Sequence, residues 1–301
     1  MKSLATYIFE ALNATEKELL EKLSKQKSLA DYVDVLNKML KDKDSKNVLI
    51  KAFIEGQDNP AYKFDAKQKN IPVTQLHPTQ SEIDVDKSLG YPFKGPKEAG
   101  DCMKMFFKDS VVEMPFPLIT FEGKYIIDGH HRWSQVFAFN PDAKMVCFDI
   151  KVKGGKVDEQ EMLKITQGFL AAKRAEDGKG EIPANHVDGA NLFEMSAEEI
   201  KNKVVEEYCG REGGEEVNQI ICNAAGQSTP EELADYLCDN LLELQKENRA
   251  YSKKGNPRGV MPQTDRGGDN PNDQKTAKPD VKGSVLNKFR SGSKTTHRTL
   301  K

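Results

Sequence analysis

The sequence predicts an α+β protein in which a small α/β domain lies between helical regions and is followed by a disordered basic tail. Two observations lead to this fold class. Before residue 57 and after residue 158, apolar residues recur at three- and four-residue steps, which is typical of amphipathic helices. Between these regions, short alternating segments bounded by glycine and proline are typical of strands.

Residues 1–57 form the first predicted region, which is helical. Thr15 followed by Glu18 fits a capping box that would begin its second helix. Glycine at residue 56 and proline at residue 60 mark the end of the region. The helices would either pair two protomers or pack on the α/β domain. Amphipathic spacing is compatible with both, so the oligomeric state stays open.

The second region, residues 68–155, is the predicted α/β domain. Its expected elements are a strand over 71–78, a helix around 100–109, a hairpin over 116–128 and a strand over 145–152. Glu122-Gly123 would make the hairpin turn, because such a pair accepts the left-handed backbone of a tight turn. Mixed elements in so short a stretch indicate packed layers around one core.

Residues 156–250 are predicted to be an acidic helical region. The expected helices cover residues 158–175, 196–209, 214–225 and 229–248. Thr229 and Pro230 are typical of an N-cap and a first helical position, so the last of these has a well-marked start.

Residues 251–301 are predicted to be a mostly disordered basic tail, with disorder over 264–301. The segment is rich in Lys, Gly, Ser, Asn and Pro and has few large apolar residues, so it cannot bury enough surface to fold alone. Val260, Met261 and Pro262 are the exception and would anchor the start of the tail to the folded body.

Charge is distributed unevenly although the net charge is only −2. Residues 249–301 carry 13 basic and 4 acidic residues (+9), and residues 158–248 carry 8 basic and 21 acidic residues (−13). The acidic block argues against a DNA-binding body. The tail would contact DNA or RNA, or fold back on an acidic surface. No apolar run is long enough to span a membrane and no secretory signal is recognised, so a cytoplasmic protein without a membrane partner is expected.

The five cysteines are expected to be free, buried and structural. Their number is odd, no two of them form a C-x-x-C pair, and they lie in apolar or helical patterns. In a reducing compartment such cysteines behave as small apolar residues.

The segment 124–139 contains the most informative motif. A strand is expected to end at Asp128, Gly129 would make the turn, and a helix would begin near His131 with Trp133 on its buried side. Glycine allows close approach of a ligand, and the unpaired N–H groups and dipole of a helix start favour an anion.

Phosphate is the anion that this motif predicts. His130, His131 and Arg132 would place hydrogen-bonding or cationic groups at the helix start, and the arginine fork matches phosphate oxygens. The alternative is that both histidines only cap the helix and pack on Trp133. A His–His metal site is disfavoured, because neighbours on a helix project in different directions.

The segment 71–83 (IPVTQLHPTQSEI) followed by YIIDGHHRW at 125–133 resembles the ParB/sulfiredoxin superfamily, especially ParB-like nuclease domains with a D-G-H-H-R signature. The resemblance covers residues 68–155 and implies a small nucleotide-binding fold in which the turn holds the phosphates of ATP, ADP or CTP. By the resemblance, Gly129, His130, His131 and Arg132 would line those phosphates. Members include chromosome-partitioning CTP switches, sulfiredoxins, free-serine kinases and proteins described as nucleases.

Two departures from the family narrow this implication. Sulfiredoxins have a cysteine in the turn where this chain has His130, so sulfinic-acid reduction is not expected. Partitioning proteins have an arginine pair in the turn and a DNA-reading helix-turn-helix after it, whereas this chain has only Arg132 there and acidic helices after it. Phosphoryl transfer and phosphodiester cleavage remain, so the chain would be either a ParB-like nuclease or an NTP-dependent phosphotransferase.

Either reaction needs an acid or base beside the phosphates, and a divalent cation such as Mg²⁺. The predicted catalytic residues are Glu82 as general base, Asp128 as turn-holding or magnesium-associated acid, and His131 as general acid. Thr79 and Gln80 are predicted neutral contacts to phosphate or base. Glu82 would otherwise be a solvated loop carboxylate, and Asp128 an Asx-turn residue.

A function of another class is a non-catalytic interaction protein that retains the ParB-like fold. The opening segment MKSLATYIFEAL is similar to the amphipathic starts of many tailed-phage proteins, which implies a phage accessory or structural protein in the host cytoplasm. In that case nucleic-acid contact would come through residues 251–301.

Overall fold

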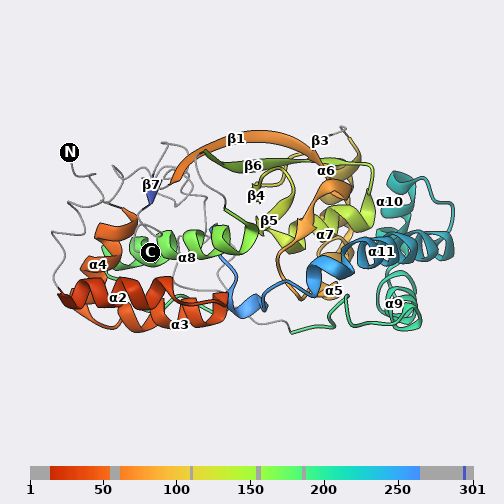
Figure 1. Ribbon diagram of the computed structural model, residues 1–301. Helices are drawn as coiled ribbons and strands as arrows, with labels where there is room; N and C mark the ends of the chain where they lie inside the picture. Colours follow the sequence, from red (N-terminus) through yellow and green to blue (C-terminus); the bar gives the residue numbers. More distant parts are fainter. Residues whose placement is uncertain are drawn as a thin grey trace. The chain divides into compact units, whose positions relative to one another are not determined.

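The computed structural model describes residues 14–54, 62–108, 111–153, 157–184, 188–264 and 294–295. These residues form a mixed α+β structure, as predicted (Figure 1). The chain divides into two compact units. Unit 1 is Met1–Lys67 with Asp149–Asn185 and Gly259–Lys301, and unit 2 is Gln68–Phe148 with His186–Arg258. This differs from the four consecutive regions predicted, because the acidic helical region is shared between the units.

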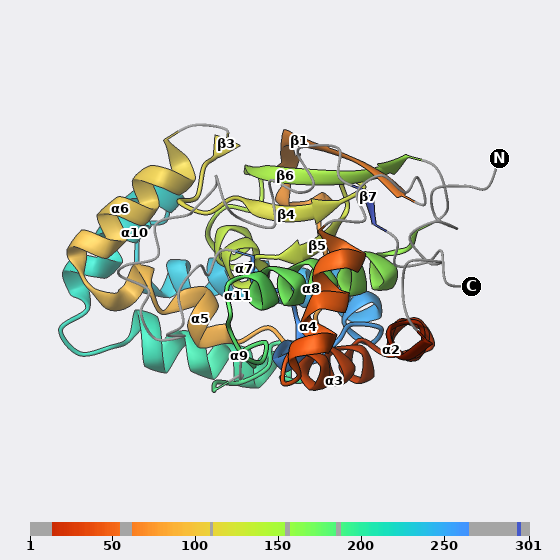
Figure 2. The same ribbon diagram turned by 90° about the vertical axis from the view of Figure 1, so that its left-hand side faces the viewer.

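The described strands form one mixed sheet, in the order β2-β5-β4-β6-β1-β7 with β3 beside β6. Figure 2 shows the neighbouring strands β1, β6, β4 and β5 of this sheet. The strands are β1 (Tyr62–Pro72), β2 (His77–Pro78), β3 (Val111–Val112), β4 (Leu118–Phe121), β5 (Tyr125–Asp128), β6 (Lys144–Lys153) and β7 (Lys294–Thr295). Strands β4 and β5 pair antiparallel, whereas β2 runs parallel to β5. The predicted hairpin is confirmed, with Glu122 and Gly123 at φ 54° and 68° in its turn.

The strand predicted over 71–78 is wrong in its middle. Residues Val73–Gln75 form a 3₁₀ turn that separates β1 from β2. Alternation would place Val73 and Leu76 on opposite faces, but both side chains are fully buried, which a turn with three residues per repeat permits. The Val73 N–H donates to the Ala143 carbonyl oxygen at 3.0 Å, so burial and pairing both favour the turn.

Unit 1 contains four described α-helices: α2 (Ala14–Ser24), α3 (Leu29–Met39), α4 (Lys43–Phe53) and α8 (Glu159–Glu176). The capping box predicted at Thr15 is wrong, because Thr15 lies within α2 and not before it. Ser28 and Asp42 are the observed N-caps of α3 and α4, since each side chain accepts a backbone N–H of the first turn. Gly168 of α8 leaves room for the Phe53 ring.

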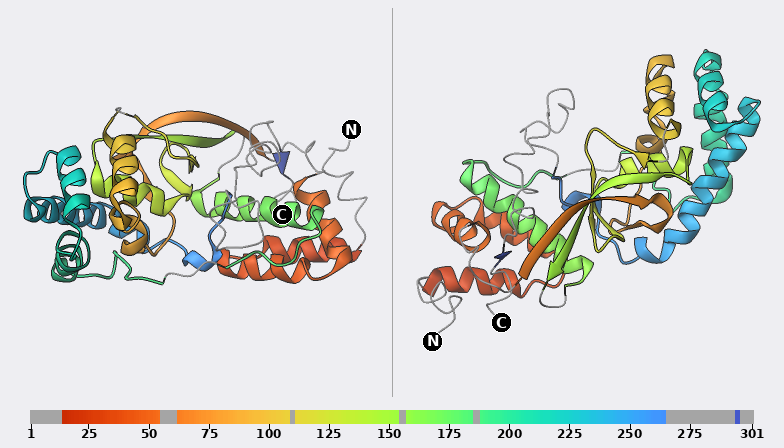
Figure 3. Two further views of the ribbon diagram at one scale, coloured as in Figure 1. Left: turned by 180° about the vertical axis from the view of Figure 1, so that it is seen from behind. Right: turned by 90° about the horizontal axis from the view of Figure 1, so that it is seen from above.

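Unit 2 contains the described helices α5 (Val85–Leu89), α6 (Pro96–Phe107), α7 (His130–Phe139), α9 (Ala197–Lys203), α10 (Glu215–Ala225) and α11 (Pro230–Ser252). The helix predicted over 196–209 changes to a π-helix after Lys203. Thr229 caps α11 as predicted, through the backbone N–H of Glu232. Helices α10 and α11 lie side by side (Figure 3).

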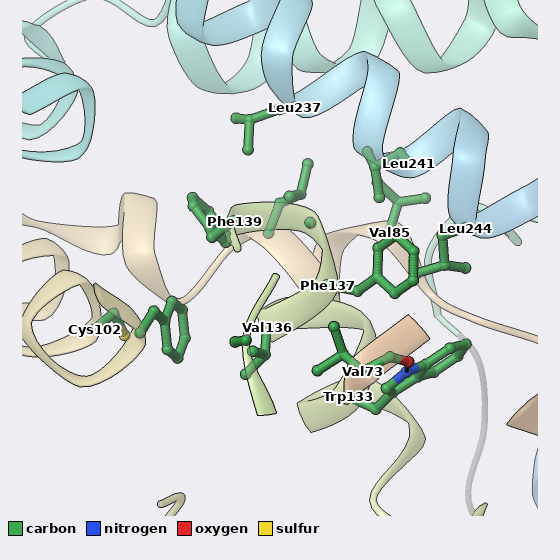
Figure 4. Close-up of a cluster of buried hydrophobic side chains, with 14 of the residues drawn as sticks. Val73, Val85, Cys102, Trp133, Val136, Phe137, Phe139, Leu237, Leu241 and Leu244 are labelled. Atoms are coloured by element: carbon green, nitrogen blue, oxygen red, sulfur yellow. Dashed lines mark hydrogen bonds between the residues drawn. The ribbon is translucent and has the colours of Figure 1, made fainter. Parts of the chain in front are cut away.

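Helix α7 lies in the centre of the unit 2 core (Figure 4). Eight of its ten residues are buried, including Trp133, whose side chain is 0% exposed. The indole Nε1–H of Trp133 donates to the Val73 carbonyl at 2.9 Å. At the other end of α7, Asn240 and Tyr236 of α11 donate to the carbonyls of Ala138 and Phe139, at 2.8 and 2.9 Å. The helix is therefore held at both ends.

The boundary placed at residue 250 is too early, because the described chain stays folded beyond it. Helix α11 continues to Ser252, and the predicted anchor is confirmed: Met261 is 4% exposed and the Val260 carbonyl accepts Gln167 Nε2 at 2.6 Å. Within the segment predicted to be disordered, the structure describes Lys294–Thr295 as strand β7, which pairs antiparallel with β1. Apart from β7 and Thr264, the segment 264–301 lies outside the described residues.

The five cysteines are buried and free, as predicted. Burial raises the pKa of the Cys102 and Cys209 thiols to about 12, so neither carries a reactive thiolate near neutral pH. Among the helices described, none combines the length and apolar character that crossing a membrane requires.

Trp133→Phe tests the role of the indole in holding α7. The substitution leaves the buried Val73 carbonyl without its donor and a small cavity beside it, so we expect the free energy of unfolding to fall by about 2–3 kcal/mol. Urea unfolding followed by far-UV circular dichroism measures the change. Tyr91→Phe at a side chain with 54% exposure is the control and should change it by about 0.5 kcal/mol or less. Equal effects of the two substitutions would contradict this role.

Candidate functional site

The turn between β5 and α7 has the geometry that the motif predicts. Gly129 is the N-cap of α7 and has φ 103° and ψ 21°, in the left-handed region that favours glycine. A Cβ at this position would collide with Leu118 Cδ2 and lie 2.9 Å from Arg132 Nη2. The Arg132 guanidinium therefore folds back over the turn at the start of the helix, where its Cζ also lies 5.9 Å from the centre of the Phe116 ring.

His130 is buried and hydrogen-bonded. Its Nε2 accepts the backbone N–H of Thr79 at 3.2 Å, and the Thr79 hydroxyl donates to the Ile126 carbonyl at 2.5 Å. Burial, and then the positive charges of Arg258 and Arg132, together lower the pKa of His130 to about 3. His130 is therefore a neutral acceptor that ties Thr79 to the turn.

His131 is also neutral and makes an equivalent connection to the same loop, five residues further along. Its Nε2 lies 3.1 Å from the backbone nitrogen of Asp84, which donates to it, and 3.2 Å from Arg258 Nη1. Burial and then the charge of Arg258 hold the pKa of His131 well below its usual value. In this arrangement only Nδ1 carries a proton. A neutral imidazole is a much weaker acid than an imidazolium, so the low pKa does not favour the general-acid role of His131, which stays a prediction.

The other predicted residues lie along the same loop, before α5. The Glu82 carboxylate Oε2 accepts the backbone N–H of Arg258 at 2.7 Å, and the buried Gln80 amide donates to the Glu82 carbonyl. Thr79, Gln80 and Glu82 are therefore connected to the turn or to its partners. Asp128 is partly buried at the end of β5, opposite Ile119 of β4.

Asp84, whose backbone N–H binds His131, is also the N-cap of α5. Its carboxylate is 2% exposed, caps α5 through the Lys87 N–H at 3.2 Å and pairs with Lys87 Nζ at 3.4 Å. The Lys87 charge in turn contributes to the low pKa of His131. Lys87 is therefore close enough to His131 to lower its pKa, and its ammonium group is paired with the carboxylates of Asp84 and Asp188.

Arg258 and Asn256 are site residues that motif reasoning did not select. Asn256 pairs with the loop as a short parallel bridge: its N–H donates to the Thr79 carbonyl and its carbonyl accepts the Ser81 N–H, both at 2.9 Å. The only sequence signal was the apolar block after Arg258, which predicted that the tail start is anchored. Anchoring by itself did not indicate where the arginine would lie.

The predicted Mg²⁺ finds no ready set of protein ligands in the described part of the chain. No cluster of three or more His, Cys, Asp or Glu side chains there could hold a metal ion. The Glu82 and Asp84 carboxylates are already engaged by N–H groups or Lys87. We therefore assign no step to a metal held by protein side chains alone.

Comparison with models of known protein families, with curated protein sequences and with solved structures found no match for this chain. The resemblance to ParB-like domains thus rests on the motif residues themselves.

His130→Gln tests the burial of a neutral imidazole. Between pH 6.5 and the folded pKa of about 3, the unfolded state binds a proton that the folded state does not, so stability falls as the pH falls. Glutamine can still accept the Thr79 N–H but cannot be protonated, so we expect the variant to lose about 2 kcal/mol less stability than the wild type between pH 7 and pH 5. Urea titrations at each pH measure this difference.

The control for this pH test is His77→Gln, because His77 is less buried and its hydrogen bond to Asn248 opposes the lowering of its pKa. We expect a smaller change in the pH dependence for this variant. Wild-type behaviour of His130→Gln across the same pH range would show that His130 is protonated in the folded protein.

Proposed function

We propose that the turn from Asp128 to Arg132 binds the phosphate groups of a nucleotide, ATP, ADP or CTP, and that the chain catalyses phosphoryl transfer or phosphodiester hydrolysis there. One observation carries the proposal. The Arg132 guanidinium lies over Gly129 at the first turn of a buried helix, where N–H groups and helix dipole also favour an anion.

The electrostatics of the turn support phosphate as the ligand. The histidines are neutral, so the positive charge comes from arginine, which stays charged at every physiological pH. A guanidinium can donate two parallel hydrogen bonds to a phosphate group, and such charged bonds are about twice as strong as neutral ones. The D-G-H-H-R signature and its resemblance to ParB-like nuclease domains agree with this ligand class.

In the catalytic part of the proposal, Glu82 is the general base and Asp128 is the magnesium-associated carboxylate of the turn. Glu82 is connected through the backbone of Arg258 to the same cluster as His131, which supports a carboxylate base at this site. Any Mg²⁺ would be held largely by the phosphates themselves, as is usual for this ion, with Asp128 as the nearest acidic group of the turn.

A non-catalytic nucleotide-binding protein is the second candidate, and one observation favours it. The Nε2 of His131 and one carboxylate oxygen of Glu82 already accept hydrogen bonds from the protein. Groups that are engaged in this way hold a structure together and have less freedom to move a proton. Binding without turnover would then be the function of the turn.

Arg132→Ala tests the phosphate site. Isothermal titration with ATP, ADP and CTP, each with Mg²⁺, should show binding of at least one nucleotide to the wild type, and the variant should bind it about 100-fold more weakly or not at all. At about 100 times its dissociation constant the nucleotide should also stabilise the wild type by about 2.7 kcal/mol.

Arg211→Ala is the matched control. Arg211 is an exposed arginine of the same unit, and its substitution removes the same charge. Nucleotide binding by Arg132→Ala as tight as in the wild type would place the phosphate site elsewhere, and absence of binding to the wild type would overturn the proposal. Incubation of the wild type with the bound nucleotide and with DNA separates the enzyme from the non-catalytic binding protein. Only the enzyme would transfer or release a phosphoryl group of the nucleotide, or cleave the phosphodiester bonds of DNA.

A further inference from the structure

A second arginine reaches the proposed phosphate site from a distant part of the chain. Arg258 lies 127 residues after His131 and places Nη1 3.2 Å from His131 Nε2. We propose that Arg258 is a second phosphate-binding residue of this site, and that residues 255–258, called the strap here, position it. The inference rests on the proposed function, because it concerns the same ligand at the same turn.

The strap is attached to the loop before α5 by two backbone–backbone hydrogen bonds and by one from the backbone to a carboxylate. The carbonyl of Thr79 and the N–H of Ser81 both pair with Asn256, and the Arg258 N–H donates to the Glu82 carboxylate at 2.7 Å. Three successive bonds to a loop that is itself tied to His130 and His131 leave the Arg258 backbone little freedom. Its side chain therefore starts from a fixed point beside the turn.

Gly255 allows the strap to approach this closely. A Cβ at Gly255 would lie 2.5 Å from the Gln80 carbonyl carbon and 2.7 Å from the Ser81 nitrogen, both backbone atoms. Backbone atoms cannot rotate away as the end of a flexible side chain would. Any other residue would move the strap away from the loop, and Arg258 with it.

The end of α11 anchors the strap at its start. The Tyr251 ring stacks on His77 with ring centres 3.9 Å apart and an interplanar angle of 9°, and His77 Nδ1 lies 2.8 Å from Asn248 Oδ1. Lys124 Nζ lies 5.4 Å from the centre of the Tyr251 ring. The strap begins four residues after this stacked tyrosine, so the position of its start is set by the end of α11.

The charge distribution agrees with a shared anion site. Among the charged neighbours, Arg258 lowers the pKa of both histidines more than Arg132 does, so both guanidinium groups lie close to the same two imidazoles. Because the imidazole of His131 is neutral, its hydrogen bond with Arg258 does not offset the charge of the guanidinium. Two arginine forks beside one helix start match the several oxygens of a di- or triphosphate better than one.

Arg258→Gln tests the proposal, with ATP plus Mg²⁺ and inorganic tripolyphosphate as the two probes in isothermal titrations. We expect the variant to bind both about 10- to 100-fold more weakly, as the loss of a charged hydrogen bond predicts. Arg258→Lys keeps the charge but not the fork and should lose less. Lys253→Ala removes one exposed charge just before the strap and should stay within about twofold of the wild type.

Gly255→Ala tests the positioning role of the strap. We expect it to weaken ATP binding in the wild-type background but to add little in the Arg258→Gln background, because both changes remove the same contact. Full weakening in both backgrounds would show that Gly255 supports the fold only. Thermal unfolding without nucleotide confirms for each variant that the protein is folded.

The outcomes separate this inference from the proposed function. Absence of binding to the wild type overturns both. Loss of binding in Arg132→Ala together with wild-type affinity in Arg258→Gln keeps the phosphate site and overturns the role of Arg258. Equal weakening of binding by Lys253→Ala and Arg258→Gln would show that only the net charge of the protein matters. This result would also overturn the role of Arg258.

Discussion

The burial of helix α7 is the constraint on which unit 2 depends. A buried helix must satisfy its end groups within the protein, and here α11 supplies donors to the last carbonyls of α7 while Trp133 bonds back to Val73. With its far end and its indole held, the helix cannot shift along its axis. Its first turn is therefore presented at one fixed position, directly after Gly129.

The two histidines convert this fixed turn into a junction for the surrounding loop. Each imidazole accepts one backbone N–H, from Thr79 or from Asp84, and burial keeps both rings neutral so that they can do so. The consequence is a division of roles that the motif alone conceals. The histidines organise the loop, and the positive charge is left to the arginines.

Much of this could be predicted from sequence because it is local. The turn at Glu122-Gly123, the strand-glycine-helix order around Gly129 and the burial of Trp133 follow from neighbouring residues. The break at Val73 was not predicted, because alternation over a few residues is compatible with a strand. The hydrogen bond from the distant Trp133 indole to the Val73 carbonyl is not visible in that local pattern. Arg258 was missed for the same reason, because nothing near it in the chain indicates its partners.

The sequence by itself determined the local conformations: a glycine that accepts a left-handed backbone, a helix beginning at the histidines, and an arginine three residues after that glycine. The tertiary structure alone decided which charges meet there and in which protonation state. Burial by distant segments makes the imidazoles neutral, and hydrogen bonds of Asn256 and Arg258 to the loop before α5 bring in the arginine. Both effects depend on proximity between segments far apart in the chain, which a local pattern cannot contain.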